Sequence, residues 1–522
     1  MAERKMVNLT IEGRPVSVPE GTSILEAAKV AGILIPHYCY HPGLPIAGVC
    51  RMCLVEVEKA PKLAPSCATT VAEGQVVRVH TERAVEARKG VLEFLLINHP
   101  LDCPICDQSG ECELQDYTYQ EGRGESRYRE PKRFNPMEDF GGDVIYVPNR
   151  CILCTRCVRF MEDVAQDTVL NVCERGDRAL IGKFEGKDLT HPWAGNVVDL
   201  CPVGALLSKD FLNKSRAWEL DRSASICPNC TQGCNVMLET RDAQIARIKP
   251  RPNEAVNKFF ICDYGRLNYR WINRTDRLEQ PMVRTSGALQ TIDWDVAIHA
   301  AAGLLRDRRA YVLASPMLSN EALHLLSKLA SRNAGTREFR VATGDEAPLA
   351  GVEDLALRRD RAANVYGAEL FGFRRTEAPL SSLAASDVLV VAGDDLKNID
   401  PSIVERAAEV IVIGTTLPEV ARNATVALPI TNFAEEEGTF TNLRGRVQRF
   451  TQAKPAPGLA RPSWLVLGDL LGVLGQQQEF FLPSEVFADI ARSYHELAGL
   501  SYDRLGMKGL PVLSAQPAGA PA

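Results

Sequence analysis

Cysteine is concentrated in the first half of this 522-residue chain and is absent from Asp263 onward. All 16 cysteines except Cys262 lie before residue 235, and most belong to four spaced groups. Two cysteines separated by two residues can face one metal cluster from a single turn of backbone, and a more distant ligand completes the set. The sequence therefore predicts a front half that holds several iron–sulfur clusters and a back half without cysteine ligands.

Composition and charge narrow the class of protein. The net charge of −6 and the lack of a long basic run argue against nucleic-acid binding. No stretch approaches the roughly 20 apolar residues of a membrane-spanning helix. The first residues, Met1 to Lys5, contain no apolar segment like that of a secretory signal. Clustered cysteine pairs indicate metal binding in a reducing cytoplasm rather than disulfides. Because no segment is apolar enough to span a membrane, we expect membrane contact only through partner subunits.

The first 100 residues show a local pattern of strand, strand and helix. Residues 7–11 and 14–18 alternate around Glu12 and Gly13, which predicts a hairpin. Ser23 and Glu26 form a capping-box pattern before a helix predicted over 24–31. A second helix is expected over 82–98, with His99 at its end. The order of two strands and the first helix, followed by a loop that contains cysteines, is typical of a β-grasp ferredoxin.

The back half shows a different pattern. Short apolar runs at 311–314, 388–391 and 410–413 alternate with helical stretches at 294–305 and 320–330. Such alternation predicts a parallel α/β sheet. We also predict a connector over 121–136 and a disordered tail over 510–522, since the tail is rich in Ala and Pro. The predicted fold class is thus α+β ferredoxin-like modules followed by an α/β domain.

The first cysteine group resembles the ligand set of a [2Fe–2S] ferredoxin. Its members are Cys39, Cys50, Cys53 and Cys67. Ten residues separate the first two, whereas plant-type ferredoxins have four there, so the loop around the cluster differs. A zinc ribbon is the alternative, but zinc sites usually show two close pairs and this group has one.

The second group combines one histidine with three thiolates: His99, Cys103, Cys106 and Cys112. Exchanging one thiolate of a [4Fe–4S] cluster for a neutral imidazole makes the cluster less negative, which favours its reduction. A lone histidine is more often a hydrogen-bonded structural residue. Here no fourth cysteine is available nearby, because Cys67 belongs to the first group, so we predict that His99 is a ligand.

The third group resembles one half of a bacterial two-cluster ferredoxin. Cys151, Cys154 and Cys157 form the C-x2-C-x2-C run, and Cys201, followed by Pro202, is the predicted fourth ligand of one [4Fe–4S] cluster. Cys173 competes for that position. Because Cys173 sits in an apolar stretch and lacks a following proline, we interpret it as a small buried thiol.

The fourth group resembles the N-terminal [4Fe–4S] site of molybdopterin oxidoreductases. It contains Cys227, Cys230 and Cys234, and then Cys262 after 27 residues. Gly265 and Arg266 after the last cysteine also match that family. Zinc again is the alternative on spacing alone.

The order of the four groups resembles the large iron–sulfur subunit of respiratory complex I over residues 7–447. In the back half, residues 432–448 resemble the E-x-x-G-T-x-x-N-x-x-G-R-x-Q segment of molybdopterin oxidoreductases. The resemblance implies an electron-carrying subunit of NADH-quinone oxidoreductase with one [2Fe–2S] and three [4Fe–4S] clusters. It implies no catalytic residue in this chain, since NADH is oxidised at a flavin on a partner subunit.

The same resemblance implies partners and location. The expected partners are the flavin-bearing subunit with its small [2Fe–2S] companion, and the downstream iron–sulfur and quinone-site subunits. The expected location is the peripheral arm on the cytoplasmic face of a bacterial inner membrane. The domains follow the motifs, with predicted ranges 1–80, 81–138, 139–218, 219–275 and 276–522.

The chain departs from active molybdenum enzymes in two respects. Its back half has only about 250 residues, which leaves little room for a large cofactor beside a core, and it has no cysteine to bind molybdenum. We therefore expect no molybdopterin. Three alternatives stay open: a formate dehydrogenase-type molybdenum or tungsten enzyme, a diaphorase subunit of an NAD-linked hydrogenase, and a zinc-bearing scaffold.

Overall fold

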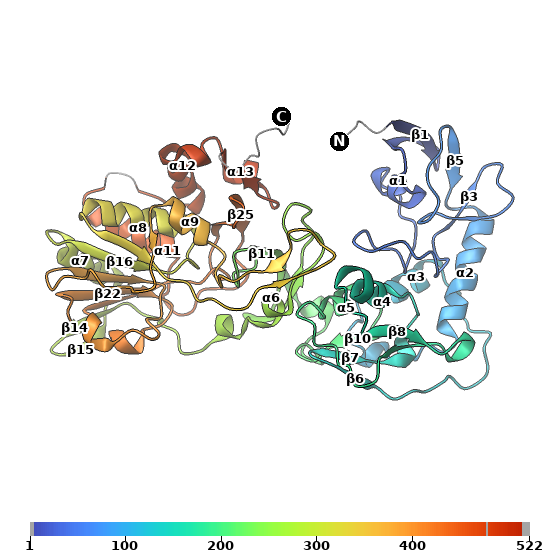
Figure 1. The fold of residues 1–522 in the computed structure, drawn as a ribbon, viewed down its shortest axis with the longest axis horizontal. Helices are drawn as coiled ribbons and strands as arrows, with labels where there is room; N and C mark the ends of the chain where they lie inside the picture. The colour runs from blue at the N-terminus through green and yellow to red at the C-terminus, as the bar shows by residue number, and fades with distance from the viewer. Residues whose placement is uncertain (1–4, 477–478, 514–522) are drawn as a thin grey trace. The chain divides into compact units, whose positions relative to one another are not determined.

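The computed structural model describes residues 5–476 and 479–513, which form two compact units (Figure 1). The first unit contains the chain up to Leu220 together with residues 349–353. The second contains residues 221–348 and the chain from Asp354 onward. Among the described residues, no helix is both long and apolar enough to cross a lipid bilayer.

The first unit begins with a five-stranded sheet of order β2-β1-β5-β3-β4. The predicted hairpin is confirmed, because β1 (Met6–Ile11) pairs antiparallel with β2 (Arg14–Pro19). Helix α1 (Ile24–Val30) begins as predicted, with the Ser23 side chain accepting a hydrogen bond from the Glu26 N–H. The other strands are β3 (Leu54–Val57), β4 (Ala64–Pro65) and β5 (Gln75–Arg78). Apolar side chains of the sheet and α1 form one core.

Two helices and several short strands complete the first unit. Helix α2 (Glu82–Leu96) ends two residues before the predicted end, and α3 (Glu113–Glu121) follows the second cysteine group. One small sheet has the order β10-β7-β6, and the hairpin of β8 and β9 forms another. The remaining elements are β6 (Glu138–Gly141), β7 (Val144–Tyr146), α4 (Arg156–Arg159), β8 (Leu170–Cys173), β9 (Leu180–Lys183), α5 (Asn196–Leu200) and β10 (Leu206–Ser208).

The second unit is built around an eight-stranded sheet of order β15-β14-β23-β22-β21-β16-β17-β20. The predicted parallel pairing is confirmed for β16 (Ala310–Ala314), β21 (Val388–Ala392) and β22 (Glu409–Gly414). Every residue of β16 and β21 is buried, as expected for strands covered on both faces. The remaining strands are β14 (Met282–Thr285), β15 (Ala288–Thr291), β17 (Thr336–Phe339), β20 (Arg374–Arg375) and β23 (Val426–Pro429).

Side chains of the central strands alternate between two cores. Val312, Val390 and Ile411 point into the larger core, which includes residues of α7 (Trp294–Leu305), α8 (Asn320–Arg332), α11 (Ser463–Val473) and α12 (Pro483–Ser493). Their neighbours Tyr311, Leu389 and Val410 belong to the smaller core on the other face. The period of two along each strand thus buries both faces. Shorter elements are β18 (Ala347–Pro348), β19 (Ala356–Leu357), α9 (Val365–Leu370), α10 (Pro401–Val404) and α13 (Tyr502–Leu505).

The second unit also contains two three-stranded sheets, one formed by strands around the fourth cysteine group and the other by strands near the end of the chain. The first contains β11 (Asp221–Ile226), β12 (Asn235–Arg241) and β13 (Gln244–Pro250). The second contains β24 (Gly438–Thr441), β25 (Arg446–Phe450) and β26 (Leu510–Pro511). The prediction of disorder over 510–522 is therefore wrong at its start, because Leu510 pairs with Val447 and Val512 is buried. Residues 514–522 lie outside the described part of the chain.

Candidate metal centres

The four cysteines of the first group lie together beside the β-grasp sheet. The Cys39 N–H contacts the Cys50 sulfur at 3.4 Å. Hydrogen bonds join the Cys39 thiol to those of Cys50 and Cys67, and these bonds lower the pKa of Cys39 while raising the pKa of Cys50. A hydrogen bond from Cys67 lowers the pKa of Cys53 to about 7. The fold thus gathers all four predicted ligands into one group of sulfur atoms.

Three members of the second group, His99, Cys103 and Cys112, line a cavity of about 550 Å³, whereas Cys106 is not part of its lining. Burial, together with the charges of Lys132 and Arg150, lowers the pKa of His99 to about 4, so its imidazole is neutral. The His99 Nδ1 atom is buried and has no hydrogen-bond partner. A neutral imidazole with an unpartnered ring nitrogen fits a metal ligand.

The other members of the second group are placed by short helices. Cys103 begins a 3₁₀ turn that ends at Ile105, and Cys112 is the N-cap of α3. Burial raises the pKa of Cys112 to about 11, and the charges of Cys106 and Cys103 add to this shift. A metal must displace the protons of these thiols to bind them.

The third group lines one enclosed cavity. Its walls contain all four predicted ligands, Cys151, Cys154, Cys157 and Cys201, and the remaining lining is largely apolar. Burial raises the pKa of Cys151 to about 11 and that of Cys154 to about 12. Four soft sulfur donors without a carboxylate fit an iron–sulfur cluster or zinc.

The backbone between the three close cysteines of the third group adopts an unfavourable conformation at two residues. Leu153 and Thr155, which separate the three close cysteines, have φ angles of 51° and 59°. Such left-handed angles are uncommon for leucine and for the β-branched threonine. Strain of this kind persists where the surrounding structure enforces it and is concentrated at functional sites.

Cys173 does not line the third cavity. It lies at the end of β8, paired with Leu180 of β9, and it is half-buried rather than fully buried as expected. We predict that Cys173→Ala leaves the iron content per chain unchanged, because the four cavity cysteines suffice for one cluster. Iron analysis of the purified variant checks this, and a loss of about four irons would mean that Cys173 is a ligand.

Three of the four cysteines in the fourth group lie in the connection between two strands of the second unit. Cys227 directly follows β11, Cys234 directly precedes β12, and the Cys227 N–H donates to the Cys234 carbonyl at 2.8 Å. Cys262 is the N-cap of α6 (Asp263–Leu267), and its sulfur accepts a hydrogen bond from the Gly265 N–H at 3.3 Å. A Cβ atom on Gly265 would lie 3.1 Å from the Cys227 sulfur, so α6 packs closely against this group.

The molybdopterin oxidoreductase-like segment packs against the same loop. The Gln448 side chain donates to the Gly233 carbonyl at 2.9 Å, and the Asn442 side chain donates to the Gln232 carbonyl at 3.4 Å. Gly233 has a φ of 60°, and a Cβ there would come within 3.0 Å of Asn442. Residues of this segment therefore support the loop that carries the fourth group.

His99→Cys tests the imidazole ligand. We predict that this variant keeps the second cluster but lowers its reduction potential, because a fourth thiolate adds negative charge. A redox titration followed by paramagnetic resonance measures the shift. An unchanged potential would show that His99 does not bind the cluster.

Within the described residues, no three His, Cys, Asp or Glu side chains are close enough to hold a single metal ion. An iron–sulfur cluster, in contrast to a single ion, distributes its ligands over several irons.

Contacts that the sequence does not reveal join the second and third groups. The Glu113 N–H, next to Cys112, donates to the carbonyl of Pro202, next to Cys201, at 3.0 Å. A Cβ atom on Gly204 would lie 2.2 Å from the Cys106 sulfur. The sequence signal for this contact is weak, because a small residue after Cys-Pro-Val is also compatible with an ordinary turn.

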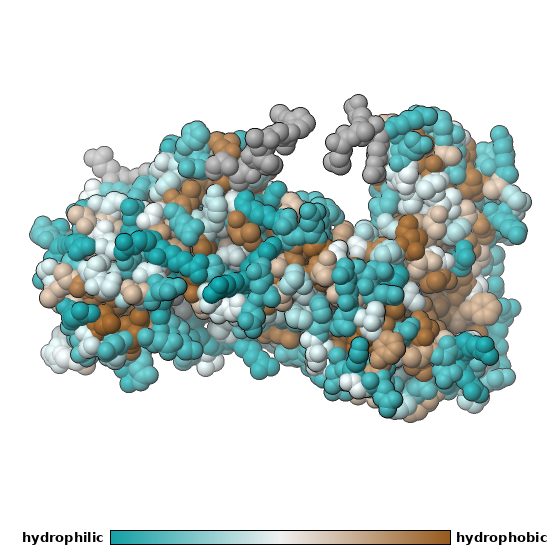
Figure 2. Space-filling model, viewed as in Figure 1, coloured by the Kyte–Doolittle hydropathy of each residue, from teal (hydrophilic) through white to brown (hydrophobic). Residues whose placement is uncertain are grey.

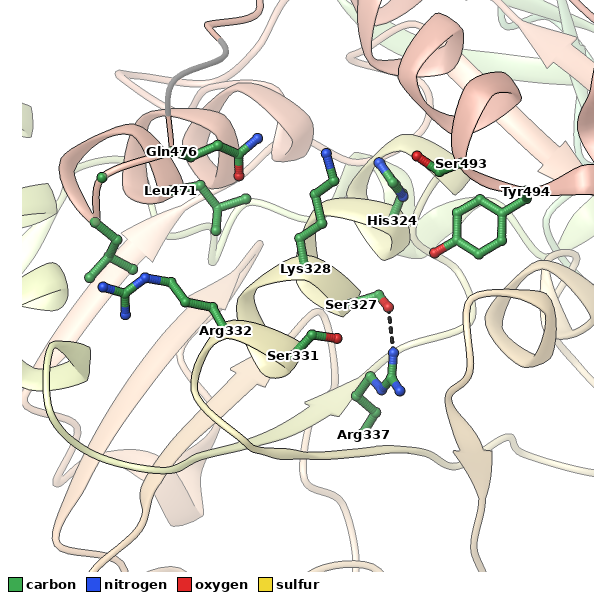
Figure 3. Close-up of a pocket in the computed structure, with 12 residues that line it drawn as sticks. His324, Ser327, Lys328, Ser331, Arg332, Arg337, Leu471, Gln476, Ser493 and Tyr494 are labelled. Atoms are coloured by element: carbon green, nitrogen blue, oxygen red, sulfur yellow. Dashed lines mark hydrogen bonds between the residues drawn. The ribbon is translucent and has the colours of Figure 1, made fainter.

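Two other cavities lie in the second unit. The first, of about 750 Å³, is lined by side chains that include Lys328, Arg332 and Arg337 (Figure 3). Helices α8, α11 and α12 all end near it, and their C-terminal ends carry partial negative charge. Lys328 forms an ion pair with Asp489 of α12, and Arg337 donates hydrogen bonds to Ser327 Oγ and to the Phe371 carbonyl. They contact none of the predicted ligands.

The second cavity, of about 460 Å³, lies at the carboxyl ends of the parallel strands. Ser315, Gly393 and Thr415 line it, and they directly follow β16, β21 and β22. Ligands of open α/β sheets bind at this edge. The short back half thus retains space for a small ligand.

Family models match successive parts of the chain. They describe a 2Fe-2S iron-sulfur cluster binding domain at residues 4–82, an NADH-ubiquinone oxidoreductase-G iron-sulfur binding region at 88–127 and a ferredoxin-like domain of NADH-quinone oxidoreductase subunit 3 at 141–207. A molybdopterin oxidoreductase Fe4S4 domain matches 221–274, and the molybdopterin oxidoreductase model matches 277–419 and 405–473. These matches confirm the predicted fold class.

Curated relatives are similar over the same region. The G subunit of NADH-quinone oxidoreductase from Rickettsia bellii is 40% identical over 341 residues, which cover 64% of this chain and 50% of the relative. The mitochondrial NADH dehydrogenase [ubiquinone] iron-sulfur protein 1 of Solanum tuberosum is 44% identical over 301 residues, covering 58% of this chain and 41% of the relative. The matched region thus spans about half the length of these relatives.

A solved structure of an NAD+-reducing [NiFe]-hydrogenase in its H2-reduced state is 29% identical, with a TM-score of 0.35. The match covers 40% of this chain and 90% of the hydrogenase chain. The family of this chain follows from the domain models and the curated relatives. The chain is therefore a homologue of the G subunit of NADH-quinone oxidoreductase, with iron–sulfur domains followed by a molybdopterin oxidoreductase domain.

Proposed function

We propose that this chain is an iron–sulfur electron-transfer subunit of NADH-quinone oxidoreductase. In this role it accepts electrons that originate at the flavin of a partner subunit and passes them towards quinone. The observation that carries the proposal is the agreement between four sulfur-rich groups and four matched iron–sulfur domains. We propose one [2Fe–2S] and three [4Fe–4S] clusters, held by the ligands predicted above.

The clusters, when bound, supply carriers of single electrons. The chain's own residues determine where these carriers lie and how readily they are reduced. Contacts within the first unit support an order in which the third group lies between the first and the second. Arg159 reaches carbonyls of Cys39 and Cys154, while Glu113 and Gly204 join the third group to the second.

Exposed apolar side chains near the second group support docking of a partner. Leu101 and Tyr119 line the same cavity as His99 and are 88% and 94% exposed, and Phe94 is 79% exposed on α2. Figure 2 shows hydrophobic surface over the part of the first unit that includes α2. Contiguous exposed apolar surface marks interaction sites. We propose that other subunits of the complex cover it, in the peripheral arm at the cytoplasmic face of the membrane.

A molybdenum or tungsten oxidoreductase is the second candidate, and the cavity at the carboxyl ends of the parallel strands favours it. Our proposal predicts neither metal in the purified protein. Elemental analysis for molybdenum and tungsten distinguishes the two candidates.

Iron and acid-labile sulfide per chain, measured on protein purified without oxygen, test the main proposal. The predicted ligand sets require about 14 irons per chain, and low-temperature paramagnetic resonance should resolve one [2Fe–2S] signal beside [4Fe–4S] signals. Protein that contains zinc and no sulfide would refute the proposal.

A further inference from the structure

Arg159 joins the first and third groups through their backbones. Its Nη2 atom donates to the carbonyl of Cys39 at 2.5 Å and to the carbonyl of Cys154 at 3.2 Å. Its Nη1 atom donates to the carbonyl of Pro45 in the loop of the first group. One guanidinium therefore contacts ligand residues of two predicted clusters that are more than 100 residues apart in sequence.

Arg156 joins all three groups of the first unit. It lies between Cys154 and Cys157 and is buried. Its guanidinium donates to the carbonyl of Tyr40 at 2.9 Å and to the carbonyl of Leu200 at 3.2 Å, each adjacent to a predicted ligand. It also donates to both carboxylate oxygens of Glu113, at 3.1 and 3.2 Å, and Glu113 adjoins Cys112.

The two arginines differ in the charges that face them. The Glu113 carboxylate opposes the charge of Arg156 directly in a two-point ion pair. Arg159 donates hydrogen bonds only to neutral groups, namely Thr155 Oγ1 and backbone carbonyls. The charged groups near it are Asp163, Arg156 and the sulfurs of Cys39 and Cys154. The positive charge of Arg159 is thus less completely neutralised by hydrogen-bonded partners.

We propose that Arg156 and Arg159 are positioning residues with separate tasks, a role that rests on the proposed electron-transfer function. Arg156 fixes the third group relative to the first and second, through contacts that a lysine cannot reproduce. Arg159 places a positive charge between the first and third groups, where it favours the reduced, more negative state of each cluster. The pair thereby sets both the spacing and the reduction potentials along this part of the chain.

Arg156 acts through the number of its hydrogen bonds, and Arg159 acts through its positive charge. A planar guanidinium can hold several acceptors at once, so Arg156 constrains three segments, whereas the ammonium of lysine is a compact point charge. A unit charge about 10 Å from a redox centre, at an effective dielectric constant of about 20, changes a one-electron equilibrium roughly tenfold. Removing the Arg159 charge should therefore shift the potentials measurably.

The test uses the full chain, purified without oxygen, with iron and sulfide counted in every variant. Arg159→Gln should keep its iron but lower the potential of the third cluster by about 59 mV, the equivalent of a tenfold change in a one-electron equilibrium. The first cluster should shift in the same direction. Arg159→Lys should restore most of the potential. Arg83→Gln, on an exposed side chain of the same unit, is the matched control and should leave both potentials unchanged.

Arg156 requires different variants, because Arg156→Gln alone leaves the Glu113 carboxylate without its partner. Arg156→Lys keeps the charge, and the double variant Arg156→Gln with Glu113→Gln removes both charges together. Both should alter the magnetic coupling between the reduced first and third clusters, which pulsed paramagnetic resonance measures, while the iron count is kept.

Unchanged potentials in Arg159→Gln, or loss of the third cluster in both Arg159 variants, would overturn the charge role. Unchanged magnetic coupling in both Arg156 variants would overturn the spacing role. Absence of iron and sulfide from the unsubstituted chain would instead refute the proposed function, so the two failures are distinguishable.

Discussion

Replacing Gly204 with alanine should remove the second cluster. The new Cβ would lie 2.2 Å from the Cys106 sulfur and 3.2 Å from the Gln108 Cβ, so a predicted ligand has to move. The backbone of Gly204 is not left-handed, and alanine is therefore tolerated there apart from this collision. We expect the iron content to fall from about 14 to about 10 per chain. The paramagnetic signal of the second cluster should disappear.

Gly90→Ala is the matched control. Gly90 lies within α2, and a Cβ there would have no neighbour within 4 Å. Alanine in a helix interior stabilises by about 1 kcal/mol relative to glycine, so this variant should keep all its iron. If Gly204→Ala also retained full iron and an unaltered second-cluster signal, Cys106 would not be a ligand.

Glu321→Gln should make the stability of the second unit less dependent on pH. Glu321 is fully buried, and burial raises its pKa to about 7. Its carboxyl oxygens interact with the Thr439 N–H, the Thr439 hydroxyl and the Tyr502 hydroxyl. Because the folded state holds the proton more tightly than the unfolded state, this contribution is complete below about pH 4.5 and is lost as the pH rises through 7.

The rise in the pKa of Glu321 determines how much stability the second unit loses as the pH increases. A rise in the pKa of Glu321 from its ordinary value of 4.5 to about 7 corresponds to about 3 kcal/mol of stability lost by pH 8. Urea unfolding at pH 5 and pH 8 should show a smaller decrease for Glu321→Gln than for the unsubstituted chain. Glu419→Gln, at a side chain that is 82% exposed, is the control. An identical decrease in Glu321→Gln and the unsubstituted chain would contradict the raised pKa.

A second buried carboxyl contributes to the same dependence. Burial also raises the pKa of Glu436 to about 7, and the negative charge of Glu321 adds to this effect. Glu436 accepts hydrogen bonds from the Thr431 hydroxyl at 2.8 Å and from the Ser463 N–H at 2.7 Å. Residual pH dependence in Glu321→Gln is therefore expected from Glu436.

Much of the local structure could be predicted from the sequence. The hairpin around Gly13, the start of α1 at Ser23 and the helix from Trp294 to Leu305 all follow from patterns within about a dozen residues. The strands at 388–392 and 409–414 were predictable for the same reason, since runs of valine and isoleucine bury both faces of a parallel sheet. Strands β14 and β15, which pair antiparallel at one end of the sheet, were not predicted, because none of their residues is fully buried and they show little periodicity.

The tail shows where composition misleads. Alanine and proline near the end of the chain predicted disorder from residue 510, yet Leu510 completes a strand ladder with Val447 and Val512 is buried. The partner strand lies more than 60 residues earlier in the chain. A contact of that separation stabilises the segment without leaving a local signal.

The predicted chemistry of this protein follows from its sequence alone, because the number, type and spacing of soft ligands limit which metal clusters a chain can hold. The sequence predicts four ligand sets, one of which includes an imidazole. Only the tertiary structure decided which groups adjoin one another, through Arg156, Arg159 and Gly204. Ligand spacing is a local property of the backbone, whereas the contacts of these three residues join segments that are distant in sequence and meet only after the chain has folded.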